Sequence, residues 1–185
     1  MSQSLGGRPT RPPAMGTSAM VSSPHYLATL AGLKILQNGG SAVDAAISVN
    51  STLGVVYPHM TGMGGDAFWL IHDAETRTVH ALNGSGRAVG QATRDRYRAT
   101  GHDSIPRRGP LAAVTVPGAV DSWCMAHERF GRLSLADDLA QAIAYARVPG
   151  VGRAVALHRG NDRCSFPARA DGAHLHAGWA HSCCG

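Results

Sequence analysis

The chain has 185 residues, of which 44% are hydrophobic and 16% charged, a composition typical of a globular protein rather than a disordered one. Its length favours one domain around a single core, and no apolar run approaches the length of about 18 residues that a transmembrane helix needs. The net charge of +5 comes almost entirely from arginine, since Lys34 is the only lysine. Because these arginines are not interleaved with aromatic residues, neither a nucleic-acid partner nor a membrane partner is expected.

The N-terminal segment predicts neither a folded element nor an export signal. Residues 1–13 are rich in Gly, Pro, Arg and Ser, which predicts disorder. No apolar core of the length of a secretory signal follows within the first residues. We therefore expect a cytoplasmic protein, with export as the alternative if the true start lies upstream.

Two helices are predicted in the next part of the chain. Weak alternation predicts a short strand over 17–23, after which Ser23 is the expected N-cap and Pro24 the first residue of a helix that ends at Gln37. A second helix is predicted over 42–56. It opens with a capping-box pattern and is apolar or small almost all round, so we expect it to be buried.

A glycine-rich turn follows this second helix. Pro58 is predicted to end the helix, because proline disfavours helical geometry at the residue before it. Three glycines are predicted to take positive φ and to let the backbone pass close to neighbouring chain: Gly62, Gly64 and Gly65. His59 is expected to be a structural hydrogen-bond partner, and Asp66 either caps the following strand or contacts substrate. A phosphate-binding loop follows a strand and opens a helix, whereas this turn does the reverse, so a simple turn is predicted.

The central part of the chain alternates between strand and helix patterns. We expect strands over 67–72, 78–82 and 112–116, helices over 120–130 and 135–147, and one short possible helix over 91–98. The polar loop between the first two strands has the size of a hairpin connection. Helices that alternate with antiparallel strands predict an α+β layered fold.

Residues 148–185 differ in character from the rest. They show neither helical nor strand periodicity and hold three of the four cysteines, so an irregular tail is expected. Structural zinc sites favour paired ligands at short, regular spacing, and the tail lacks such pairs, so no metal is predicted there. Unpatterned sequence rich in Arg, Ala, Gly, His and Cys is typical of GC-rich DNA translated out of frame. We therefore expect a divergent tail, either frameshifted or disordered.

Four blocks of the sequence resemble the gamma-glutamyltransferase (gamma-glutamyltranspeptidase) family, in the family's order. They are MVSSPH at 20–25, AGLKILQNGGSAVDAA at 31–46, PHMTGMGGDAF at 58–68, and VPGAVDSW at 116–123 with AIAYAR at 142–147. The resemblance covers residues 14–147, which correspond to the N-terminal part of the family's large subunit.

The resemblance implies a partial αββα sandwich of the N-terminal-nucleophile (Ntn) hydrolases. In that family a precursor cleaves itself, and the new N-terminal threonine of the small subunit attacks a gamma-glutamyl amide such as that of glutathione. No metal or organic cofactor is implied. The nucleophile belongs to the small subunit, which is the implied partner. The resemblance therefore predicts no catalytic residue in this chain and no activity of the chain alone.

The family's large subunit contributes an arginine, after the second hairpin strand, that binds the substrate α-carboxylate. With ATRD at 92–95 as the anchor, Ser85 stands at the position of that arginine and Arg87 lies two residues further on. Ser85 and Arg87 are therefore the candidate substrate-binding residues. The serine leaves open a related Ntn acylase or amidohydrolase with a non-glutamyl amide substrate. A small basic binding module, with a metal-binding tail, is a further alternative.

Overall fold

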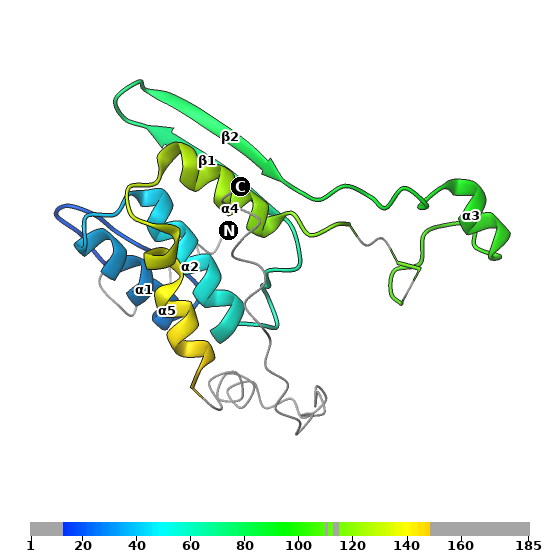
Figure 1. Ribbon diagram of the computed structural model, residues 1–185, viewed down its shortest axis with the longest axis horizontal. Coiled ribbons are helices and arrows are strands. Elements are labelled where there is room, and N and C mark those ends of the chain that lie inside the picture. The colour runs from blue at the N-terminus through cyan, green and yellow to red at the C-terminus, as the bar shows by residue number, and fades with distance from the viewer. Residues whose placement is uncertain (1–12, 110, 113–114, 149–185) are drawn as a thin grey trace, which may run out of the picture.

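The computed structural model describes residues 13–109, 111–112 and 115–148. The predictions for residues 1–12 and 149–185 lie outside the described residues. Figure 1 shows the elements, in chain order: α1 (Tyr26–Gln37), α2 (Ala42–Val56), β1 (Ala67–Asp73), β2 (Thr78–Gly84), α3 (Arg94–Ala99), α4 (Ala119–Phe130) and α5 (Leu135–Ala146).

These elements form the layers of an α+β fold, as the sequence predicted. The β1–β2 hairpin lies along α4, and α4 lies against the group formed by α1, α2 and α5 (Figure 1). The hairpin is antiparallel and pairs Ala67 with Gly84 at one end and Asp73 with Thr78 at the other. The core is formed by residues of α2 and α4, with apolar side chains of β1, α4 and α5 packed against it: Val43, Ile47, Trp123 and Ala126, with Trp69, Ile71, Phe130, Leu135 and Leu139.

Helix α2 confirms the expectation of a buried helix with a capping box. The Ser41 hydroxyl accepts a hydrogen bond from Asp44 N at 3.1 Å, and Ser41 N donates to Asp44 Oδ2 at 2.7 Å. Most positions of the helix are buried, including Ile47 and Val56, which are fully so. Local capping and the lack of a polar face are therefore sufficient to predict this element.

Helix α1 begins two residues later than the sequence predicted. Its N-cap is His25, whose Nδ1 accepts a hydrogen bond from Leu27 N at 3.2 Å. Ser23 instead donates from its hydroxyl to His25 O at 2.9 Å, so it supports the cap from outside the helix. Burial lowers the pKa of His25, which keeps this nitrogen an acceptor.

One predicted strand is wrong, and another lies partly outside the described residues, since 113–114 are not among them. Residues 17–23 are irregular, and Val21 lies against Gly32 of α1 rather than beside a strand. Of the segment 112–116, Thr115 forms only an isolated bridge with Ala88. In both places the local pattern resembles a strand, but no neighbouring strand is present among the described residues to pair with it. The other two strands are confirmed and extend slightly beyond their predicted ends.

The expected geometry of the glycine turn is also wrong. Among the described glycines, positive φ occurs at Gly39, Gly101 and Gly109. Gly62, Gly64 and Gly65 do not share it, and a Cβ added to any of them would meet no atom within 4 Å. The turn crosses open surface, and the crowded glycines lie elsewhere, among them Gly84 and Gly118, where the end of β2 passes the start of α4.

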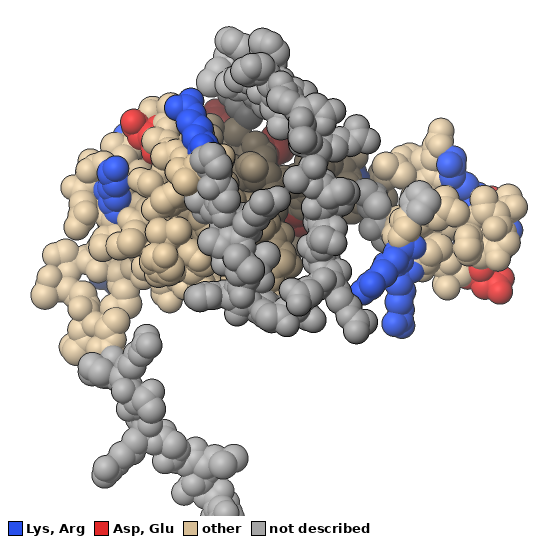
Figure 2. All heavy atoms as spheres, turned by 90° about the horizontal axis from the view of Figure 1, so that it is seen from below, with Lys and Arg blue, Asp and Glu red and all other residues tan. Residues whose placement is uncertain are grey.

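Residues between β2 and α4 form an arm that extends away from the layers and carries α3 (Figure 1). Helix α3 begins three residues later than expected because Thr93 caps it, accepting from Arg96 N at 3.3 Å, and none of its residues is buried. On the face seen in Figure 2, Lys and Arg side chains lie at separate places on the main body and on this arm. No helix among the described residues is long and apolar enough to cross a bilayer.

Candidate functional site

Both candidate substrate-binding residues lie on one loop, residues 84–88, directly after β2. The loop backbone is fixed by three hydrogen bonds. Ser85 N donates to Asn83 Oδ1 at 2.9 Å, and Gly86 N donates to Asp66 Oδ1 at 3.0 Å. Val116 N donates to Arg87 O at 2.9 Å. The backbone of the loop is thus held in place while the side chains of Ser85 and Arg87 remain exposed.

Asp66 joins the glycine turn to this loop. In addition to the bond from Gly86 N, its Oδ1 accepts from the Thr115 hydroxyl at 3.2 Å. The sequence left two roles open for Asp66, capping the strand or contacting substrate. The structure shows a third role, because the carboxylate ties the start of β1 to two segments far along the chain. The sequence did not predict the hydrogen bond from Thr115, because nothing in the residues around Thr115 indicates it.

The start of α4 lies against the same loop. Gly65 O accepts from Gly118 N at 3.1 Å and from Ala119 N at 2.9 Å. A Cβ on Gly118 would overlap Gly84 O and would lie 2.9 Å from Gly86 N. The end of the glycine turn, the 84–88 loop and the first residues of α4 therefore meet at one place. Two of these three segments belong to the motif blocks quoted above.

The hairpin is fixed to α4 beside this meeting point. Trp69 Nε1 donates to the Ser122 hydroxyl at 3.0 Å, and this hydroxyl donates to Ala119 O at 2.6 Å. Gly84 is buried against Ser122, with no space for a side chain. The loop is therefore positioned by both the sheet and the helix below it.

The side chains on the loop can take part in binding. No hydrogen bond or ion pair joins the Arg87 guanidinium to another described residue, so its donors are available for an anionic group such as a carboxylate. Ser85 offers a hydroxyl two residues away. His59 lies apart from this function. Its exposed ring contacts Tyr57 at 4.3 Å between centroids, and among the described residues it has no hydrogen bond of the kind the sequence led us to expect.

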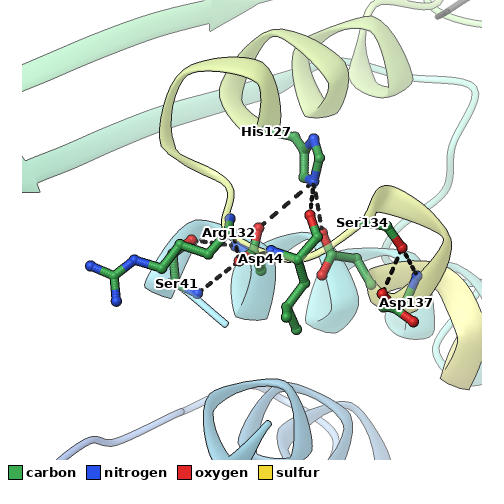
Figure 3. A network of polar contacts seen from close by, with 8 residues as sticks. Ser41, Asp44, His127, Arg132, Ser134 and Asp137 are labelled. Carbon is green, nitrogen blue, oxygen red and sulfur yellow. Dashed lines mark hydrogen bonds and ion pairs between the residues drawn. The ribbon is translucent and has the colours of Figure 1, made fainter. Parts of the chain in front are cut away.

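A second polar cluster lies between the helices and was not predicted (Figure 3). It consists of Asp44 of α2, His127 of α4 and Asp138 of α5. His127 Nε2 lies 3.9 Å from Asp44 Oδ1 and 3.8 Å from Asp138 Oδ2. Burial, and after it the charge of Asp44, raise the pKa of Asp138 to about 6, with His127 opposing the rise. Only Asp44 had a sequence signal, through its capping box, because the other two residues lie more than 80 positions along the chain.

The family model of gamma-glutamyltranspeptidase matches residues 28–155. The glutathione hydrolase-like YwrD proenzyme of Bacillus subtilis strain 168 is 55% identical over 133 residues, covering 72% of this chain and 25% of the relative. The oxamate amidohydrolase proenzyme of Klebsiella pneumoniae is 44% identical over 137 residues, covering 71% of this chain and 25% of the relative.

A solved gamma-glutamyltranspeptidase structure is also similar to the chain. The gamma-glutamyltranspeptidase of Helicobacter pylori matches with a TM-score of 0.64 and 31% sequence identity, over 71% of this chain and 38% of that one. The chain thus spans about a quarter of the length of the curated relatives it matches.

Proposed function

The chain belongs to the gamma-glutamyltranspeptidase family, and we propose that it forms the N-terminal part of the large subunit of an Ntn amidohydrolase. In this role the chain supplies part of the sandwich and a substrate-positioning loop. The nucleophile is the N-terminal threonine of a small subunit, with its own α-amine as the base. The observation that carries the proposal is the uncovered outer face of the hairpin.

The two faces of the hairpin differ in what covers them. The inner face, which includes Trp69 and Ile71, packs on the core with α4. On the outer face, Phe68 is 73% exposed, Leu70 is 82% exposed and Val79 is 64% exposed. Sheets in layered folds bury both apolar faces, and an exposed apolar patch of this kind marks an interaction surface. We propose that the remainder of the precursor, small subunit included, covers this face.

The 84–88 loop is the proposed substrate-binding contribution of this chain. Asp66 and Val116 hold its backbone, so the Arg87 guanidinium extends from a fixed base. A guanidinium fork can bind a substrate carboxylate through two parallel hydrogen bonds and so orient the adjacent amide for attack. Arg87 then takes the place of the family arginine whose position is held by Ser85.

Two substrate classes follow from this loop. A gamma-glutamyl amide is the first, in keeping with the glutathione hydrolase-like relative. The second is a smaller or differently shaped amide that carries a carboxylate, favoured by Ser85 and by the oxamate amidohydrolase relative. In either case Arg87 binds the substrate carboxylate. Because Arg87 lies two residues beyond the position of the family arginine, the distance between the bound carboxylate and the amide under attack differs from that in the family.

The role of Arg87 is tested by Arg87→Ala in a full-length precursor that contains this segment. Loss of a charge-assisted bond is worth about 1.5–3 kcal/mol, so KM should rise about 10- to 100-fold while kcat changes less. Arg98→Ala, an exposed arginine on α3, is the matched control and should leave both constants unchanged. An unchanged KM in Arg87→Ala would show that Arg87 is only a surface residue.

The chain by itself should be inactive, because the proposed nucleophile belongs to the small subunit. Purified chain incubated with gamma-glutamyl-p-nitroanilide, and separately with oxamate, should release neither nitroaniline nor ammonia. Turnover above the blank with either compound would contradict the assignment of the nucleophile.

A further inference from the structure

The cluster of Asp44, His127 and Asp138 joins three helices at one buried point. Asp44 lies in the first turn of α2, His127 in the last turn of α4 and Asp138 in the first turn of α5. The side chains of both aspartates are 0% exposed, and that of His127 is 22% exposed. One ligand atom from each residue lies within 4.8 Å of the other two. Figure 3 shows His127 directed from α4 toward Asp44.

Several carboxylate oxygens of the cluster accept no hydrogen bond from the described residues, although His127 Nε2 lies within ion-pair distance of two of them. Asp44 Oδ2 is fully used, since it accepts from Ser41 N, Arg132 N and Leu133 N at 2.7, 2.9 and 3.3 Å. Asp44 Oδ1 and both oxygens of Asp138 are buried without a hydrogen bond. Buried polar groups are nearly always paired, and buried charges especially so. These three buried oxygens therefore need a cation or a proton to balance their charge.

We propose that Asp44 Oδ1, His127 Nε2 and Asp138 Oδ2 bind one divalent transition-metal ion, with Zn²⁺ as the best match. Two carboxylates neutralise its charge, and an imidazole ligand favours zinc-like ions over Mg²⁺ or Ca²⁺, which prefer oxygen ligands alone. Neighbouring ligands of tetrahedral zinc lie about 3.3 Å apart. The separations of 3.8 and 3.9 Å thus need only a small closure around the ion.

The surroundings of His127 fit such a site. His127 Nε2 lies 2.8 Å from Leu133 O, so in the loaded site this hydrogen bond is given up and the ring proton moves to Nδ1, which leaves Nε2 able to bind the ion. The partial exposure of His127 gives the ion a path from solvent. The site ties the α4–α5 connection to α2 and lies on different residues from the 84–88 loop. Its role is structural: bound metal stabilises the packing of the three helices.

Zinc content measures the proposal directly. The whole chain is dialysed against Zn²⁺ and its bound metal is counted by mass spectrometry, which gives a stoichiometry whether the chain is monomeric or associated. Asp138→Asn and His127→Gln should each bind one equivalent less than the parent chain. Asp121→Asn, an exposed carboxylate on α4, is the matched control and should bind as the parent does. Cysteines and histidines outside the described residues are common to all four chains and add the same background.

Melting temperature provides the second readout. Zinc at about 100 times its Kd should stabilise the parent by about 2.7 kcal/mol, which raises its Tm by about 8 °C, and should leave the Tm of Asp138→Asn unchanged. Without metal, Asp138→Asn should melt no lower than the parent, because it removes a buried charge that accepts no hydrogen bond from the described residues. This comparison separates loss of metal from loss of fold. Equal zinc content in the parent and in both variants would overturn the proposal and would show that a proton, rather than a metal, satisfies Asp138.

Discussion

Gly84→Ala is predicted to be among the most destabilising substitutions that add a single methyl group to this chain. Gly84 is buried, and a Cβ there would overlap the Ser122 side chain and lie 2.8 Å from Ala67 O. Neither neighbour can move freely. Ala67 is the ladder partner of Gly84, and the Ser122 hydroxyl is fixed by its bonds to Ala119 O and Trp69 Nε1 at 2.6 and 3.0 Å.

The magnitude follows from two costs. Overpacking of a fixed core position costs about 1–3 kcal/mol, and loss of the bond between Trp69 and Ser122 costs about 1 kcal/mol more. A total of about 2–4 kcal/mol lowers Tm by about 6 to 12 °C for a domain of this size. Thermal unfolding followed by far-UV circular dichroism measures this shift.

Gly64→Ala is the matched control from the motif that the sequence singled out. Gly64 has no positive φ, and a Cβ there would meet no atom within 4 Å. The methyl group should be neutral or should stabilise by about 0.4–1 kcal/mol, since alanine restricts the unfolded chain. Equal losses for the two variants, or a larger loss at Gly64, would refute the packing described around Gly84.

Three further predictions concern other parts of the molecule. The exposed outer face of the hairpin predicts that the isolated chain self-associates in sedimentation velocity, and Leu70→Asp should abolish this association without lowering Tm, whereas unchanged association would rule out that face as the cause. In a full-length precursor, Asp66→Ala should raise KM several-fold by freeing the 84–88 loop, with kcat affected less. Asp66→Asn should keep KM near that of the parent, because its amide oxygen can still accept from Gly86 N. An equal rise of KM in the two variants would argue against the role of Asp66 in holding the loop. Hydrogen bonds from Thr76 and Glu75 lower the pKa of Asp73 below 3.8, so its stabilising effect is present above that pH and is lost as pH falls through the lowered value. The Tm difference between the parent and Asp73→Asn should therefore close in acid, and a difference that persists at low pH would contradict this.

The helices were largely predictable because their signals are local. The capping pairs at Ser41 and Ser134 mark where α2 and α5 begin, and the observed bounds differ from the predicted ones by at most a residue. At α1 a histidine occupied the N-cap, a role that favours Ser, Thr, Asp or Asn in general, and the start was therefore placed too early.

The strands and the sites depend on distant neighbours, which is why they were predicted less well. Residues 17–23 alternate like a strand, but whether a strand forms depends on a partner that the local pattern does not reveal. A glycine in the sequence similarly indicates that the backbone can pass close to other atoms, but it does not reveal which glycines are crowded in the fold. Gly84 and Gly118 are crowded because two segments meet there. Asp66 and the Asp44–His127–Asp138 cluster acquire their roles through contacts that only the folded chain creates.

The assignment to the large subunit is tested most directly by a chimera. Residues 28–147 of this chain replace the matching segment of the YwrD proenzyme, its 55% identical relative. If this segment builds the N-terminal part of the large subunit, the chimera should be cleaved into two subunits on a denaturing gel and should retain the activity of the host. A chimera that folds but stays an uncleaved, inactive precursor, under conditions where the host matures, would contradict the proposed function.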